Sequence, residues 1–287
     1  MAIDAVAIAE HVEALLHGDD ISKTNAALKI WLSLSAAESS SDAKEQQLVV
    51  AMAGAIPLLV RLVRSGSDSA KCNASGALAK LTAVHIREEV CTAIAAAGGV
   101  AALVSLLREG GDRSKSNALA ALANLANDSD ERMIAITTAG ALPPAIELAR
   151  SGGDKAASLL PKAASLLQNL ACHKDNGVAI ALAGGIPVLV ALAESGPAGA
   201  RAHAAAALEN LAQDVDIELR IATTRGTAAL VDMARHGGVF VDDAAKDAAA
   251  RLLAERRRVI VHKCVDGKVP AELEPTVAGY LSRRGYS

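Results

Sequence analysis

A glycine-centred segment recurs along most of the chain at a nearly constant interval. The segments AGAIPLLVRL, AGGVAALVSL, AGALPPAIEL and AGGIPVLVAL begin at residues 53, 97, 139 and 183, and a weaker copy, RGTAALVDM, begins at residue 225. Each has glycine in second place, at positions 54, 98, 140, 184 and 226, so that successive glycines are 42 or 44 residues apart. A fixed period in this range is typical of a helical repeat protein. Because no single repeat can bury its apolar face alone, we predict one continuous stack of helices.

In each repeat the same residue types mark where the helices begin and end. A short apolar helix ends at the first glycine, which adopts the left-handed conformation of a helix C-cap without strain. A second helix, opened by proline or a small residue, ends at a second glycine, and a longer third helix such as GDRSKSNALAALANLAND follows. The second glycines are Gly66, Gly110, Gly152, Gly196 and Gly237. Since only 1% of the residues are aromatic, we expect these helices to pack closely through alanine, leucine, valine and isoleucine.

Three helices in about 42 residues, with AG[AG][IVL]P opening the second and AL-x-NLA in the third, resemble the armadillo-repeat family. The resemblance covers residues 10 to 255 and implies an all-α fold, a right-handed α-solenoid superhelix of about five to six armadillo repeats. We expect a degenerate N-terminal capping repeat without its first helix at 1–43, about five armadillo repeats at 44–254, and a capping helix with a flexible tail at 255–287. The pattern is most similar to armadillo scaffolds and to the repeats attached to U-box domains in plant-type ligases.

The third helix divides into a core face and a polar stripe. Positions 8, 12 and 15 after the second glycine are apolar, for example Ala118, Leu122 and Leu125, and we predict that they are buried. Positions 7, 10 and 14 form an adjacent stripe, at about 100° per residue, that the core does not use. In the third unit this register shifts by three residues because Pro161 opens the helix. The candidate site residues are Asn73, Lys80, Asn117, Asn124, Lys162, Asn169, His203, Asn210 and Arg251.

The resemblance gives this stripe a function. In the armadillo family the third helices line a concave groove, and the asparagine of AL-x-NLA holds the backbone of an extended peptide; Asn124, Asn169 and Asn210 match that position. A carboxamide suits this task because it offers a donor and an acceptor together and pairs with any peptide unit. A single asparagine in such a place is explained equally well by a solvated helix face or a helix end. Three at one register favour a peptide-binding groove.

The stripe departs from that of importin-alpha, the nuclear import receptor of this family, in which a tryptophan four residues before the asparagine sandwiches a lysine of the cargo. The corresponding residues here are Gly76, Ala120, Ser165 and Ala206. We expect the single tryptophan, Trp31, to fill the core of the first repeat, which leaves no aromatic pocket for a cation. The charges on the stripe are mostly basic, so we expect a neutral-to-acidic peptide segment of another protein as the partner.

Other classes of function are disfavoured. The balance of 29 basic against 32 acidic residues gives no field that would attract nucleic acid. The motifs of phosphate loops, hydrolases and zinc proteases are missing, so we expect no enzyme activity, catalytic residue or cofactor. The four cysteines are far apart and have no partners for a metal site. Alternatives that stay open are an importin-alpha-like transport adaptor and the substrate-recognition module of a ubiquitin ligase complex.

Location in the cell is only weakly constrained. The first residues, MAIDAVAIAEHVE, lack the pattern of a signal peptide, and alanine stands where a myristoylation signal requires glycine. Residues 176–193 carry no charge over the length of a membrane span, but GGIP in their middle predicts two short helices joined by a turn. We expect a cytoplasmic protein without a membrane anchor, and presence in the nucleus stays open.

Overall fold

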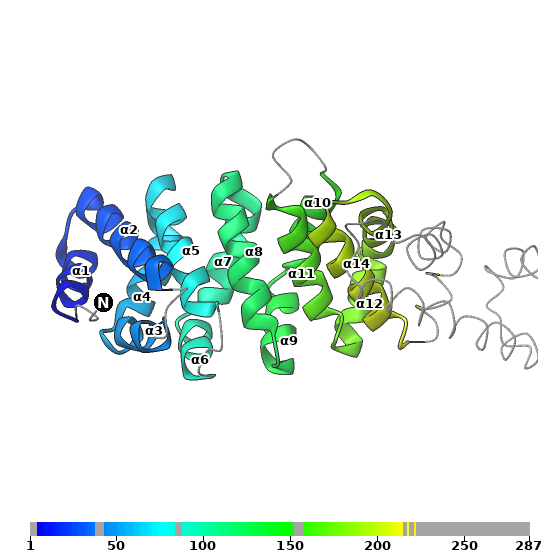
Figure 1. Ribbon diagram of the computed structural model, residues 1–287, viewed down its shortest axis with the longest axis horizontal. Coiled ribbons are helices and arrows are strands. Elements are labelled where there is room, and N and C mark those ends of the chain that lie inside the picture. The colour runs from blue at the N-terminus through cyan, green and yellow to red at the C-terminus, as the bar shows by residue number, and fades with distance from the viewer. Residues whose placement is uncertain are drawn as a thin grey trace, which may run out of the picture. The chain divides into compact units, whose positions relative to one another are not determined.

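The computed structural model describes residues 5–37, 43–83, 88–151 and 158–214, together with Ile217 and Ile221. Fourteen α-helices make up the secondary structure of these residues, and none of the described residues lies in a β-strand (Figure 1). The chain divides into two compact units, residues 1–145 and 146–287, with the boundary inside α10. The two units are described separately.

The first unit holds a two-helix repeat, two three-helix repeats and the first helix of the repeat that follows. Its helices are α1 (Ala5–His17), α2 (Asp20–Ala37), α3 (Ala43–Met52), α4 (Ala55–Ser65), α5 (Asp68–Thr82), α6 (Glu88–Ala96), α7 (Gly99–Glu109), α8 (Asp112–Ala126) and α9 (Asp130–Thr138). After α10 (Leu142–Arg150), the second unit contains α11 (Leu160–Leu170), α12 (Lys174–Leu182), α13 (Gly185–Ser195) and α14 (Ala198–Leu211). In this two-helix repeat α2 takes the place of the third helix, because it packs against α5 as α5 packs against α8. The assignment of residues 1–43 to an N-terminal capping repeat stays a prediction.

The first glycine of each described repeat has the predicted left-handed backbone. The φ angles are +79°, +78°, +82° and +77° at residues 54, 98, 140 and 184. At Gly54 an added Cβ would meet no atom within 4 Å, so conformation and not space requires glycine there. At Gly66 the reason differs: φ is −78°, but an added Cβ would lie 2.6 Å from the carbonyl oxygen of Leu62. The two glycines of a repeat are therefore required for two different steric reasons.

The core is formed by third helices stacked on one another and on the second helices. In the first unit α5 packs between α2 and α8, and in the second unit α11 packs against α14. The predicted core register is confirmed, because Ala118, Leu122 and Leu125 are all 0% exposed. The same holds for Ala74, Leu78 and Leu81 of α5, and for Ala204, Leu208 and Leu211 of α14, which are at most 1% exposed.

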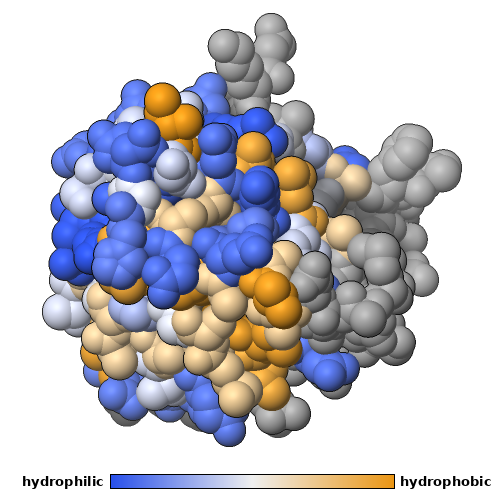
Figure 2. Space-filling model, turned by 90° about the vertical axis from the view of Figure 1, so that its left-hand side faces the viewer, coloured by the Kyte–Doolittle hydropathy of each residue, from blue (hydrophilic) through white to orange (hydrophobic). Residues whose placement is uncertain are grey.

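The N-terminal repeat leaves apolar side chains uncovered. Val6 and Leu16 of α1 are 70% and 43% exposed, and Ile21 and Leu32 of α2 are 72% and 57% exposed. Figure 2, which faces this end of the molecule, shows apolar residues beside hydrophilic ones on its surface. A repeat without its first helix has fewer neighbours for its apolar residues, which accounts for part of this exposure.

Two local predictions from the sequence are also confirmed. Pro161 lies in the first turn of α11, where it costs no hydrogen bond. The uncharged run at 176–193 forms α12 and α13, which meet at an angle of 88° around Gly184. Of the helices in the described ranges, none alone is long and apolar enough to cross a membrane, whereas three bent pairs satisfy that test by length and composition only. The fifth repeat, the C-terminal capping helix, the tail and Arg251 lie outside the described residues.

Candidate functional site

The predicted stripe is a distinct surface of the third helices. Its described members at positions 7 and 14, Asn73, Lys80, Asn117, Asn124, Lys162, Asn169, His203 and Asn210, are all half-buried, in contrast to the fully buried core positions beside them. At position 10 the helices α5, α8, α11 and α14 carry small residues, so that no large side chain of these helices separates positions 7 and 14. We refer to positions 3, 7, 10 and 14 of the third helices as the third-helix stripe.

At position 7 the asparagines bind the preceding third helix. Asn73 of α5 donates from Nδ2 to the carbonyl oxygen of Thr24 in α2 at 3.1 Å, and Asn117 of α8 donates to the carbonyl oxygen of Cys72 in α5, also at 3.1 Å. The two contacts are the same interaction repeated one unit further along. Among the described residues, none donates a hydrogen bond to the Oδ1 atom of either asparagine. Each amide is therefore fixed through its nitrogen and keeps its oxygen as an acceptor.

The position 14 asparagines follow the same direction. Asn124 of α8 donates to the Oγ1 atom of Thr82 at 3.4 Å, and Asn210 of α14 donates to the carbonyl oxygen of Gln168 at 3.2 Å. In the second unit the Nδ1 atom of His203 lies 2.7 Å from Oε1 of Gln168. These contacts link the third helices of neighbouring repeats, so the stripe residues also stabilise the stacking of repeats. The sequence pattern did not predict this role.

Trp31 is not a core filler of the first repeat, contrary to the expectation from the sequence. It is half-buried, and its ring lies over Gly76, the position 10 residue of α5. An added Cβ at Gly76 would lie 2.7 Å from Cδ2 and Cε2 of the ring. The guanidinium carbon of Arg113, at position 3 of α8, lies over the same ring at 4.9 Å from its centroid. The chain thus has an aromatic surface for a cation, and its own arginine occupies it.

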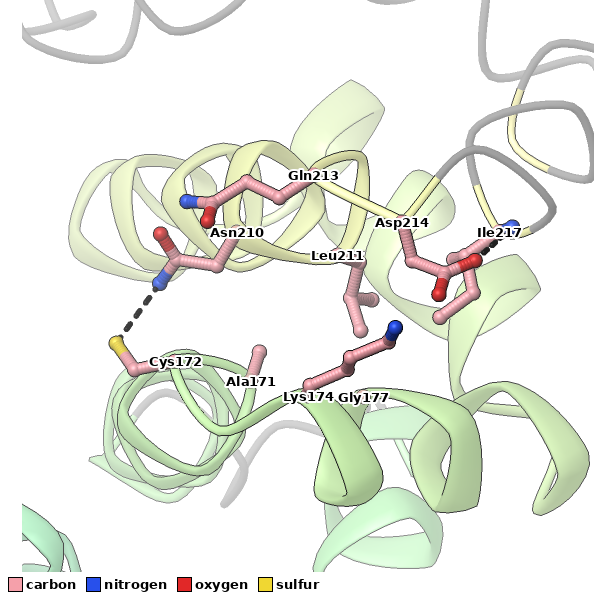
Figure 3. A pocket seen from close by; sticks show the side chains of 9 residues that line it. All are labelled: Ala171, Cys172, Lys174, Gly177, Asn210, Leu211, Gln213, Asp214 and Ile217. Atoms are coloured by element: carbon pink, nitrogen blue, oxygen red, sulfur yellow. Dashed lines mark hydrogen bonds between the residues drawn. The ribbon is translucent and has the colours of Figure 1, made fainter. Parts of the chain in front are cut away.

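One pocket borders the stripe in the second unit. It has a volume of about 370 Å³ and is lined by Ala171, Cys172, Lys174, Gly177, Asn210, Leu211, Gln213, Asp214 and Ile217 (Figure 3). Asn210 reaches it from α14 and donates to the Sγ atom of Cys172 at 3.2 Å (Figure 3). Asp214 accepts a hydrogen bond from the backbone N–H of Ile217 at 3.3 Å. The described residues contain no cluster of three or more metal-ligating side chains, here or elsewhere.

An ion pair with a buried arginine lies away from the stripe. Arg132 of α9 is 7% exposed and binds both carboxylate oxygens of Glu88 in α6, and its Nε donates to the carbonyl oxygen of Leu125 at 2.7 Å. The hydrogen bond that Arg132 donates to the Glu88 carboxylate holds the pKa of Glu88 below its usual range. The guanidinium binds a carbonyl group near the end of α8 and the carboxylate of Glu88, so it links neighbouring repeats. Nearby, burial raises the pKa of Cys91.

Comparison with known proteins agrees with this architecture. The family model described as the armadillo/beta-catenin-like repeat matches residues 43–83 and 86–127. The sequence has no match among curated proteins. A crystal structure of an engineered protein is similar with a TM-score of 0.76 at 27% identity, covering 88% of this chain and 97% of that chain.

Two further similar structures are designed armadillo repeat proteins. The first, a computational design for modular peptide recognition, has a TM-score of 0.75 at 24% identity over 86% of this chain and 98% of its own. The second was solved in complex with the peptide (KR)4 and has a TM-score of 0.73 at 23% identity over 85% of this chain and 98% of its own. At these identities the likeness concerns the fold alone.

Proposed function

Since this chain is an armadillo-repeat protein, we propose that it is a non-enzymatic scaffold that binds an extended segment of another protein along the third-helix stripe. The observation that carries the proposal is the repeated geometry of Asn73 and Asn117. Both amides are held by the preceding third helix through Nδ2, and both keep Oδ1 open to a donor outside the described chain. An extended peptide supplies such donors as backbone N–H groups, whatever its side chains are.

The expected spacing of contacts follows from helix packing. Packed helices lie about 8–10 Å apart, and an extended chain advances about 3.3 Å per residue, so one asparagine meets about every third residue of the ligand. The three third helices of the first unit, α2, α5 and α8, therefore accommodate about six to eight residues. Backbone contacts at this spacing give affinity without reading sequence, and side chains between them supply selectivity.

The charge of the stripe supports a neutral-to-acidic ligand. Its described residues include Lys80, Arg113, Lys162 and His203, and none of its described positions holds an aspartate or glutamate. A like-charged lysine-rich segment would be repelled along this path, whereas an acidic one is attracted and should bind more weakly as salt rises. The peptide (KR)4 belongs to a designed relative of different sequence, so it does not set the preference of this chain. The location of the protein in the cytoplasm stays a prediction.

The test begins with a displayed library of random 12-residue peptides, selected against the full chain. The best binder is synthesised with a fluorescent label, and its affinity is measured by anisotropy. The double variant Asn73→Ala/Asn117→Ala should bind at least tenfold more weakly. Asn127→Ala is the matched control, because Asn127 is exposed and lies after the end of α8.

A second measurement separates the backbone contacts from general weakening. Single N-methylations along the peptide remove one N–H donor at a time, and affinity should fall at positions about three residues apart. The double variant should no longer distinguish these methylated peptides from the parent. If the asparagine variants bind normally, or if the library yields no binder, the proposed function is wrong.

A further inference from the structure

The first unit contains a side-chain arrangement that the backbone contacts of the asparagines do not use. Trp31 extends from α2 across Gly76 of α5, and only a residue without Cβ leaves room for the ring. Arg113 reaches the same ring from α8. Three third helices, each about 45 residues apart in sequence, thus contribute one member each.

Arg113 is held in place and is still available. Its side chain is exposed, and among the described residues it forms no ion pair or hydrogen bond, only the contact with the ring of Trp31. Because no described residue accepts a hydrogen bond from Arg113, its guanidinium keeps its N–H donors for another group. Those donors match the two oxygens of a carboxylate or the oxygens of a phosphate.

We propose that Trp31, Gly76 and Arg113 form an anion-recognition site that binds a carboxylate or phosphate group of the extended segment, with Trp31 positioning the guanidinium. The site rests on the proposed function, because it assumes that a segment runs along the stripe. Arg113 shares this stripe with Asn117, one helical turn further along α8. A ligand held by the backbone at Asn117 therefore brings a neighbouring side chain to Arg113.

The apolar residues of α2 refine the ligand further. Ile21 and Leu32, at positions 3 and 14 of α2, are 72% and 57% exposed on the stripe. Neither is covered by the described residues, whereas the corresponding positions of α5 are Ser69 and Lys80. The expected ligand is an extended segment in which an aspartate, glutamate or phosphorylated serine is followed or preceded by aliphatic residues.

A first test uses the fluorescence of Trp31, the only tryptophan in the 287-residue chain. Quenching of the full chain is compared between iodide, an anion, and acrylamide, which is neutral. In Arg113→Ala the ratio of the iodide to the acrylamide quenching constant should fall at least twofold, because the guanidinium that attracts iodide to the ring is gone. Arg150→Ala, an exposed arginine at the end of α10, removes the same charge and should leave the ratio unchanged. An equal ratio in wild type and Arg113→Ala would overturn the site.

A second test uses the peptide selected from the library and a version with its acidic residue replaced by the amide. The amide version should bind wild type at least tenfold more weakly and Arg113→Ala within about twofold of the parent peptide. Arg113→Lys should fall between, because lysine keeps the charge but lacks the two-pronged geometry. If the selected peptide binds wild type without dependence on an acid, this site is wrong and the scaffold function stands.

The opposite result has its own signature. If the selected peptides are rich in lysine or arginine, and Arg113→Ala binds them more tightly, then Arg113 merely occupies a cation site on Trp31. That outcome overturns anion recognition and leaves peptide binding intact. A library without any binder removes the proposed function, and the quenching ratio still decides whether Trp31 lies beside an anion-attracting group.

Discussion

Replacing Gly76 with alanine tests the placement of Trp31 most directly, because the added methyl group favours the helix but overlaps with the ring. Alanine in a helix interior is favoured over glycine by about 1 kcal/mol. The new Cβ, however, would lie 2.7 Å from two ring carbons and 3.0 Å from Nε1 of Trp31, so the ring has to move. Overpacking of this kind costs about 1–3 kcal/mol, and the lost contact with Arg113 costs about 0.5–1 kcal/mol more. We expect Gly76→Ala to destabilise the protein by about 1 kcal/mol.

A double-mutant cycle isolates the effect of the ring. Urea unfolding is measured for wild type, Gly76→Ala, Trp31→Ala and the combination. Without the ring, only the helix preference remains, so Gly76→Ala should then stabilise by about 0.5–1 kcal/mol. The sign of the substitution should thus reverse between the two backgrounds, a coupling of about 2 kcal/mol. If Gly76→Ala has the same effect in both, Trp31 does not lie over Gly76 and the anion site has no platform.

Three other predictions concern stability alone and are measured by urea unfolding. Leu125→Ala should cost about 2–5 kcal/mol because the side chain is fully buried, whereas Asn124→Ala should cost under about 1.5 kcal/mol; equal losses would mean that the core register is wrong. Gly54→Ala should cost about 1–2 kcal/mol from its positive φ alone, and no loss would contradict the left-handed turn. Arg132→Met should cost about 2–3 kcal/mol. Because the pKa of Glu88 is lowered, its ion pair with Arg132 contributes to the free energy of unfolding above about pH 4.5, and this contribution is lost as the pH falls through the lowered pKa. Glu88→Gln should therefore make the free energy of unfolding decline less steeply at acid pH. An unchanged decline would refute a stabilising link between Glu88 and Arg132.

The repeat architecture could be predicted from the sequence because its determinants are local. A left-handed turn at Gly54, a core register of three apolar positions and a proline at the start of α11 each depend on a few adjacent residues. The same local pattern placed the asparagines on one stripe. It could not give their partners, because Asn117 bonds to a carbonyl 45 residues earlier in the chain.

The error on Trp31 has the same origin. Its irregular first repeat suggested a buried filler, whereas the ring lies on another helix, 45 residues further along at Gly76. One signal was present in the sequence: position 10 of α5 is glycine, whereas the third helices α8, α11 and α14 have alanine or serine there. Glycine in a helix interior destabilises the helix relative to alanine, so its presence indicates that another group occupies the space of its Cβ. At Gly76 that group is the ring of Trp31.

The polar groups on the stripe of the first unit share one property that bears on binding. Asn73 and Asn117 are fixed by the preceding third helix, and Arg113 is fixed by a ring that another third helix supplies. Fixing them before a ligand arrives lowers the entropy lost on binding, and an amide that donates through Nδ2 becomes a better acceptor at Oδ1. The geometry of the site is therefore set by how the third helices stack. A segment that binds along the stripe should in turn favour the stacked arrangement, and its binding free energy should appear as a higher urea midpoint of this unit.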